Sequence, residues 1–174
     1  NKNKKKIFFE FGCEDHGVLT SFEKFKKDIN FFKKIKNRQF IVCQTGSLVK
    51  STFQLGQFDV NGVKYMKKIA DQNGILLKEH NCDYLNLEQI KLRKKYGISA
   101  INIAPELGVI QTNLIYNLGI ELNIKKELLE FFNLVLKKKK WSKWDYNNEN
   151  KMIKFSSAGH YHFNSDQYRN LKFK

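Results

Sequence analysis

The chain has 174 residues, of which 41% are hydrophobic and 14% aromatic, and its formal net charge is +15. These values are typical of a globular protein and exclude a chain that is disordered throughout. No segment approaches the roughly 18 apolar residues of a membrane span, so we expect a cytoplasmic protein without a membrane partner.

The positive charge comes almost entirely from lysine. Only three of the 32 basic residues are arginine, namely Arg38, Arg93 and Arg169. Base readout and bidentate phosphate contacts favour arginine, whereas the lysines are spread along every predicted helix. A solvated lysine surface is therefore the favoured interpretation. A basic nucleic-acid-binding domain is the alternative, supported by the charge alone.

The cysteines indicate a reducing compartment. Cys13, Cys43 and Cys82 are odd in number and form no C-x-x-C pair, which argues against a disulfide framework. Each lies in or just after an apolar run, so we expect small buried thiols.

Hydrophobic periodicity predicts alternating strands and helices in the first half of the chain. A buried strand is expected at 7–11. Thr20 and Glu23 lie three residues apart, as in a capping box, and predict the start of a helix. Apolar residues at helical spacing continue this helix to Phe32. The following elements are a strand at 40–43, a polar glycine-punctuated segment at 47–62 and a helix at 63–70.

The second half continues the pattern. Asn86 and Gln89 predict the cap of a helix. The expected elements are strands at 75–77 and 98–104, and helices at 87–96, 107–118 and 124–136. We therefore expect one α/β domain over 1–174, with strand–helix units in 1–140 and a polar, aromatic C-terminal tail at 141–174.

Strands that are each followed by a helix imply parallel pairing with right-handed crossovers. Part of a (β/α)8 barrel and a small doubly wound sheet are both compatible with this pattern. No G-x-G-x-x-G or P-loop motif follows a strand, which weakens the nucleotide-binding doubly wound folds. Four units are about half of the eight in a TIM barrel. The charged opening that leads straight into a strand also suggests a longer protein, so we favour the C-terminal half of such a barrel.

Polar side chains recur where the predicted strands end, and in both architectures ligands bind at that edge. The four segments are 10–16, 44–46, 79–83 and 102–106. We therefore expect a functional site there, although each carboxylate alone could merely cap a loop or helix. The acid–base candidates are Glu79, His80 and Asp83, with Glu14 and His16 facing them across the rim.

The same segments supply the candidates for substrate binding. Hydroxyl, amide and backbone groups of this kind suit substrate hydroxyls and phosphate. Phosphate is expected either after the second strand or at the helix N-terminus that follows the fourth strand. In the second place, a carboxylate at 106 would repel phosphate unless it points away. The candidates are Gln44, Thr45, Gly46, Asn81, Asn102, Pro105 and Glu106.

A metal site would use His16 and His80 with neighbouring carboxylates, as in mixed histidine–carboxylate zinc sites. No H-x-H or H-E-x-x-H spacing at these positions supports it. Hydrogen-bonding or acid–base histidines are therefore favoured, and no cofactor is required, with zinc as the alternative.

One stretch carries a family resemblance. Asp83-Tyr84, the helix at 87–96 and the strand and turn at 98–107 resemble the C-terminal part of the class II D-tagatose-1,6-bisphosphate aldolase non-catalytic subunit family. There a D-Y dipeptide, a helix and a strand ending in a G-P-x-L-like turn occur in the same order. This chain has Asn102 where the family suggests lysine and Ala104 where it suggests glycine.

The resemblance implies a TIM barrel that handles a sugar phosphate in carbohydrate metabolism. The chain would be an aldolase-like lyase, or a non-catalytic assembly subunit whose partner is a catalytic aldolase subunit. A half-barrel would also leave strand edges unpaired, so we expect a homo-oligomer.

Overall fold

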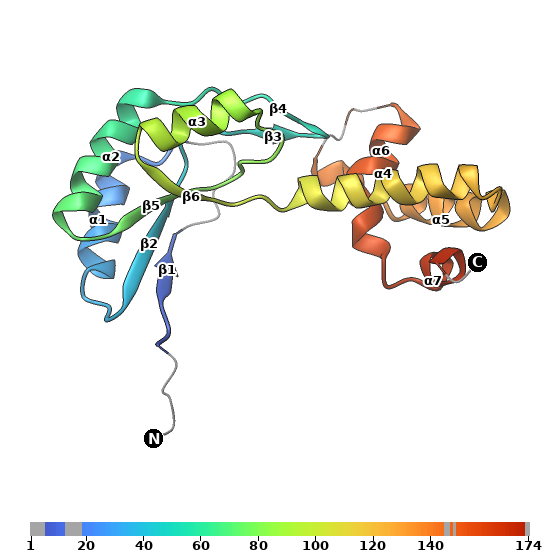
Figure 1. Ribbon diagram of the computed structural model, residues 1–174, viewed down its shortest axis with the longest axis horizontal. Coiled ribbons are helices and arrows are strands. Elements are labelled where there is room, and N and C mark those ends of the chain that lie inside the picture. Colours follow the sequence, from blue (N-terminus) through green and yellow to red (C-terminus); the bar gives the residue numbers. More distant parts are fainter. Residues whose placement is uncertain (1–5, 13–18, 145–146, 148, 173–174) are drawn as a thin grey trace, which may run out of the picture. The chain divides into compact units, whose positions relative to one another are not determined.

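The computed structural model describes residues 6–12, 19–144, 147 and 149–172. Residue contacts divide the chain into two compact units (Figure 1). The α/β unit comprises Asn1–Leu48 and Gln54–Ile103, and the helical unit comprises Val49–Phe53 and Ala104–Lys174. The helical unit thus begins well before residue 141, where the sequence placed the start of the tail.

The α/β unit is built on a four-stranded parallel sheet. Its strands are β1 (Phe9–Phe11), β2 (Arg38–Cys43), β5 (Leu76–Glu79) and β6 (Ile98–Ile101), and they lie side by side in that order. All four predicted strands are present, although β1 begins two residues later than expected and β6 ends three residues earlier. The predicted α/β class with parallel strand–helix units is confirmed.

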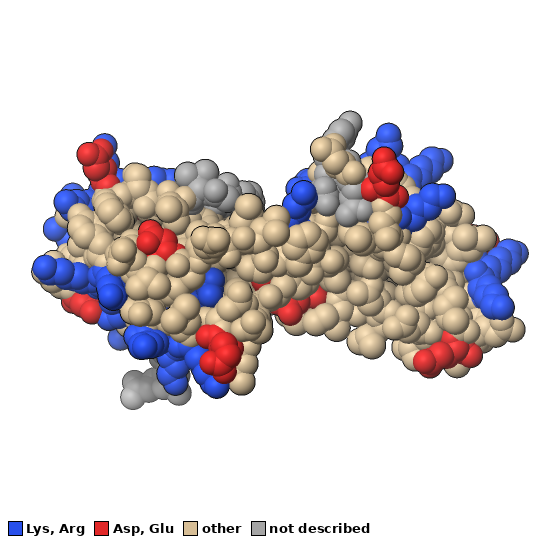
Figure 2. Space-filling view, turned by 90° about the horizontal axis from the view of Figure 1, so that it is seen from above, with Lys and Arg blue, Asp and Glu red and all other residues tan. Residues whose placement is uncertain are grey.

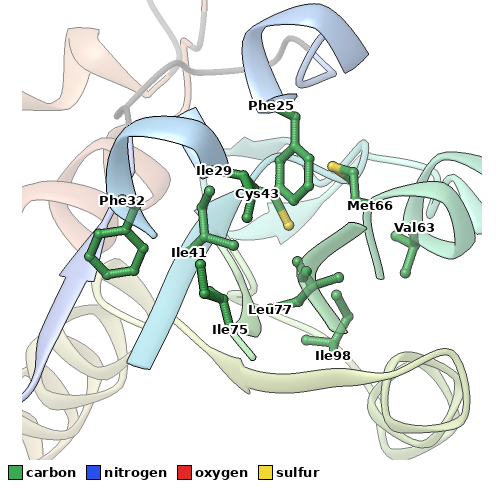
Figure 3. Packing of buried hydrophobic residues seen from close by; sticks show 11 residues of the cluster. Phe25, Ile29, Phe32, Ile41, Cys43, Val63, Met66, Ile75, Leu77 and Ile98 are labelled. Carbon is green, nitrogen blue, oxygen red and sulfur yellow. The ribbon is translucent and has the colours of Figure 1, made fainter. Parts of the chain in front are cut away.

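Three helices connect these strands: α1 (Phe22–Phe32), α2 (Val60–Gln72) and α3 (Leu87–Lys95). Strands that follow one another in chain order through right-handed crossovers place their helices on the same side of the sheet. Figure 3 shows the result: Phe25 and Ile29 from α1 and Met66 from α2 pack on strand residues. Those strand residues are Ile41, Cys43, Leu77 and Ile98.

We call the opposite side of the sheet the helix-free face. Among the described residues of the α/β unit, no helix packs against it, since α1 and α2 share one core and α3 joins them through Arg93. A doubly wound sheet has helices on both faces, whereas a wall of a (β/α) barrel has them on one. The sequential strand order, with its connecting helices on one side of the sheet, therefore agrees with part of a (β/α)8 barrel rather than with a doubly wound sheet.

Local capping agrees with one prediction and corrects another. Asn86 and Gln89 form the predicted capping box at the start of α3. The cap of α1 is Ser21, whose side chain accepts from the backbone N–H of Lys24. Thr20 instead accepts a 2.8 Å hydrogen bond from the backbone N–H of Gln44. The polar segment predicted at 47–62 contains the short strands β3 (Val49–Lys50) and β4 (Phe53–Gln54).

The helical unit has its own core. Phe131 and Phe155 are fully buried and meet edge to face, with ring centroids 5.6 Å apart. Leu128, Val135, Ala158 and Leu171 complete this core. The predicted tail is thus largely helical. The elements are α4 (Pro105–Glu121), α5 (Lys125–Lys138), η1 (Lys140–Lys143), α6 (Lys151–Ala158), η2 (Gly159–His162) and α7 (Asp166–Lys172).

Figure 2 shows how the charged side chains are distributed over one face of the molecule. On the face drawn in Figure 2, lysines and arginines lie over both units with carboxylates among them, and they do not merge into one continuous patch. Such a distribution is typical of a solvated surface. Within the part of the chain that the structure describes, no helix is long and apolar enough to cross a membrane.

Candidate functional site

The loops after β2, β5 and β6 meet at one edge of the sheet, as predicted. The backbone N–H of His80 donates to the Cys43 carbonyl at 3.1 Å, and that of Asn102 donates to the Glu79 carbonyl at 2.9 Å. The parallel ladder therefore continues past the last residue of each strand. This continuation fixes the positions of His80 and Asn102, whereas Gln44 is held through its backbone by Thr20.

Glu79 lies on the helix side of the sheet and is completely buried. One carboxylate oxygen accepts hydrogen bonds from the hydroxyls of Thr45 and Ser47. The other lies 2.8 Å from Nε of Arg93, which reaches in from α3. Because both oxygens are engaged, the carboxylate joins the loop after β2 to the end of β5 and to α3.

Arg93 makes several contacts besides the one with Glu79. Its guanidinium donates to the Ser47 hydroxyl at 3.1 Å and to the Gln89 carbonyl at 3.2 Å. It also lies over the ring of Phe58, 4.6 Å from the ring centroid, where a cation–π attraction operates. These further contacts offset part of the cost of burying the two charges.

The loop after β2 has a shape that only glycine permits. Gly46 has a φ of +99°, and a Cβ at this position would lie 1.9 Å from the carbonyl oxygen of Gln57. A Cβ at Gly56 would lie 2.0 Å from the carbonyl oxygen of Gly46. The two glycines thus allow two backbone segments to touch. Thr45 and Gln44 are buried beside them. The hydroxyl of Thr45 donates to the Glu79 carboxylate and thereby holds the loop against β5.

His80 and Asn102 come together on the other side of the sheet. Nδ1 of His80 lies 3.3 Å from the side-chain nitrogen of Asn102, and both residues are half-buried. Side chains alternate between the faces of a strand, so His80 lies opposite Glu79 and on the same side as Lys78. An imidazole beside an amide can donate or accept hydrogen bonds and can transfer a proton.

The loop at 80–84 is held by a residue that the sequence did not single out. The side-chain amide of Gln54 donates to the carbonyls of Asn81 at 2.9 Å and Asp83 at 3.2 Å. Its oxygen accepts from the backbone N–H of Leu48 at 2.5 Å. Gln54 therefore ties two strand-end loops together. Its only sequence signal is an amide, which both donates and accepts, within a glycine-punctuated polar segment.

The same loop contains two residues in the left-handed region. Asn81 has a φ of 57°, which asparagine tolerates, and Tyr84 has a φ of 60°, which costs a tyrosine roughly 1–3 kcal/mol. Asp83 between them is buried. Strained backbone of this kind clusters at functional sites. Here it lies at the Asp83-Tyr84 dipeptide that begins the family resemblance.

The remaining predicted residues fall into two groups. Glu14 and His16 lie outside the described residues. Pro105 and Glu106 occupy the first turn of α4 and belong to the helical unit. Their roles in substrate binding and acid–base chemistry stay predictions.

The described residues contain no group of three or more histidine, cysteine, aspartate or glutamate side chains that could hold a metal ion. The zinc interpretation depended on His16, so it also stays a prediction.

The two described cysteines are buried free thiols, as expected. Burial raises the pKa of Cys43 far above its usual value, and Glu79 raises it further. Burial also raises the pKa of Cys82. Since the thiolate is the nucleophilic form, neither residue suits covalent catalysis.

No family model and no curated protein sequence matches the chain. Among solved structures, it is similar to the crystal structure of a probable tagatose 6 phosphate kinase from Sinorhizobium meliloti 1021, with a TM-score of 0.75 and 13% sequence identity. The similarity covers 94% of this chain and 48% of that protein, so the chain spans about half its length. At this identity the likeness shows a shared fold.

Proposed function

We propose that the chain is the C-terminal half of a (β/α) barrel that binds a sugar phosphate in carbohydrate metabolism. More specifically, it would act as an aldolase-like protein of the class II tagatose-bisphosphate type, or as the non-catalytic subunit of one. The observation that carries this proposal is the His80–Asn102 contact, which lies at the strand ends of a sheet whose connecting helices α1, α2 and α3, as far as the α/β unit is described, all lie on one side.

Two independent likenesses support the substrate class. The stretch from Asp83 to Leu107 resembles a family named for tagatose bisphosphate. The fold is similar to that of a protein named as a tagatose phosphate kinase. The second likeness covers about half of a longer protein, which agrees with a half-barrel that is completed by further strand–helix units.

The geometry suggests different roles for the predicted residues. His80 is the acid–base or hydrogen-bonding group, and Asn102 orients it and contacts a substrate hydroxyl. Glu79 and Thr45 position the loop after β2, because their polar atoms already bind one another. Gly46 and Ser47 shape that loop for a phosphate, whose oxygens backbone N–H groups can bind.

Binding of D-tagatose 6-phosphate to the 174-residue chain, followed by isothermal titration calorimetry, tests the proposal. We expect binding that His80→Ala and Asn102→Ala each weaken by about tenfold or more, the effect of losing one good hydrogen bond. The matched control is His160→Ala in the helical unit. Absence of binding by the unmodified chain contradicts the proposal.

A second measurement separates a catalytic role from an assembly role. A catalytic class II aldolase subunit is assayed with and without this chain. A non-catalytic partner stabilises or activates that subunit, and His80→Ala leaves this effect intact. A catalytic chain cleaves the sugar bisphosphate alone, and His80→Ala abolishes the cleavage.

A further inference from the structure

An ion pair on the helix-free face has no role in the site described so far. Nζ of Lys78 lies 2.7 Å from a carboxylate oxygen of Glu10. Lys78 belongs to β5 and Glu10 to β1, and β2 lies between them in the sheet. The lysine side chain must therefore extend across β2 along the face of the sheet.

Lys78 has an aliphatic neighbour on each of the two adjacent strands. In the register of the sheet, Lys78 is level with Val42 on one side and Ala100 on the other. The small side chain of Ala100 leaves the lysine stem uncrowded on the β6 side. The lysine side chain is 18% exposed and that of Glu10 is 49% exposed, so a ligand can reach the pair mainly from the Glu10 side.

The pair lies next to the polar residues of the candidate site. His80 follows Lys78 by two residues, and Asn102 follows Ala100 by two, so alternation places both on the side of Lys78. Their side chains are in contact at 3.3 Å. The helix-free face thus carries an ammonium, a carboxylate, an imidazole and an amide toward the carboxyl ends of three strands.

A gain in stability is a weak explanation for the pair, since one of its partners is half exposed. Partly exposed lysine–carboxylate pairs contribute little to folding, because solvent screens the attraction and ordering two long side chains costs entropy. Parallel strands are also typically apolar on both faces, so a charged pair in their middle is unusual.

We infer that Lys78, oriented by Glu10, is a substrate-binding residue that donates hydrogen bonds to the hydroxyl groups of a sugar phosphate. An ammonium has three N–H donors, and the bond to Glu10 uses one of them. A carboxylate next to an ammonium offers both an acceptor and donors, which matches the alternating needs of adjacent hydroxyls. This inference rests on the proposed function for its substrate class and extends the site to β1.

The test compares two probes, D-tagatose 6-phosphate and inorganic phosphate, by isothermal titration calorimetry with the 174-residue chain. We expect Lys78→Met to weaken binding of the sugar phosphate by about tenfold or more and to leave binding of inorganic phosphate unchanged. Lys91→Met is the matched control, because Lys91 forms a similar 2.8 Å pair with Glu88 on the exposed side of α3.

If Lys78→Met weakens binding of inorganic phosphate as much as that of the sugar phosphate, Lys78 contacts the phosphate group and the inference about hydroxyl groups is wrong. If Lys78→Met binds the sugar phosphate as tightly as the unmodified chain, the inference is wrong while the proposed function stands. If the unmodified chain binds no sugar phosphate, both fail. Should Lys78→Met not fold, as judged by circular dichroism, Glu10→Gln decides. Weaker sugar-phosphate binding then supports the inference, and unchanged binding overturns it.

Discussion

Glu79 and His80 are neighbours in the chain but lie on opposite sides of the sheet. Glu79 is buried against Arg93, whereas His80 meets Asn102 on the helix-free face. The alternation of side chains along a strand produces this separation. One residue thus holds the loops in place, and the next is directed toward the face where a ligand can approach.

Arg93→Met is expected to lower the free energy of unfolding by about 3–5 kcal/mol, because it leaves the buried Glu79 carboxylate without its counter-charge. Urea unfolding followed by circular dichroism measures this change. A second substitution, Glu79→Met, should restore part of the loss, since no buried charge then remains.

The control for this prediction is the exposed pair on the same helix. Lys91→Met breaks the contact with Glu88 and should leave the free energy of unfolding nearly unchanged, because both side chains are mostly exposed. Equal effects at Arg93 and Lys91 would refute the structural role of the buried pair.

Gly46→Ala is expected to destabilise the α/β unit by more than about 2 kcal/mol, since it adds a steric clash to a left-handed backbone. Gly74→Ala is the matched control. Gly74 also has a positive φ, of 63°, but no atom lies within 4 Å of a Cβ placed there. Gly74→Ala should lower the free energy of unfolding by about 1 kcal/mol, which is the cost of the left-handed backbone alone. Thermal melts of both variants measure the difference, and equal losses would contradict the backbone contact with Gln57.

Much of the α/β unit could be predicted because its signals are local. Apolar runs marked the four strands, and Asn86 with Gln89 marked the start of α3. The position of the site followed from the rule that ligands bind at the carboxyl ends of parallel strands.

The contacts within the site depend on residues that are far apart in the sequence. Arg93 lies on a helix whose sequence is lysine-rich and typical of a solvated surface, and its burial depends on Glu79, which is distant in sequence. The separation of Glu79 from His80 is different, because it follows from strand alternation alone: adjacent strand residues point to opposite faces.

The helices α4 and α5 of the helical unit were predicted, but the part after residue 141 escaped prediction for a different reason. Its core combines Phe131 of α5 with Phe155 of the short helix α6, and α6 spans only eight residues. So short a segment shows little helical periodicity, and its stability comes from tertiary packing. Aromatic residues in a polar context are therefore easily taken for an irregular tail.

Two histidines should make the helical unit sensitive to acid. Burial lowers the pKa of His160 below its usual value, and burial with the nearby Lys140 and Lys138 lowers the pKa of His162. Both are neutral in the folded and unfolded states well above pH 6.5. As the pH falls below that value, the unfolded chain takes up protons first, so the folded state loses stability.

Urea midpoints at pH 7.5 and 5.5 measure this sensitivity. We expect the loss between the two pH values to be smaller in the double variant His160→Gln, His162→Gln than in the unmodified chain. The carboxylates titrate equally in both proteins, so the difference reports the two histidines. An identical pH dependence would show that their protonation does not oppose folding.

An exposed apolar stripe on α4 leads us to expect that the chain self-associates. Leu107, Ile110, Leu114 and Leu118 recur three and four residues apart along this helix, and each is 48–63% exposed. Their spacing places them in one stripe on the helix surface. The opposite side of α4, with Val109 and Thr112, packs inside the helical unit. Burying such a stripe against a second copy gains roughly 25 cal/mol for each Å² removed from water.

We therefore expect the 174-residue chain to be larger than its monomer mass of 20.6 kDa in size-exclusion chromatography with light scattering. Leu114→Lys with Leu118→Lys should shift it toward the monomer, because each lysine would carry a charge into the contact. Leu129→Lys is the control, as Leu129 is similarly exposed but lies on α5 outside the stripe. A monodisperse monomer of the unmodified chain with a cooperative melt would refute self-association. It would also weaken the half-barrel proposal, since the edges of β1 and β6 would then be stable without partner strands.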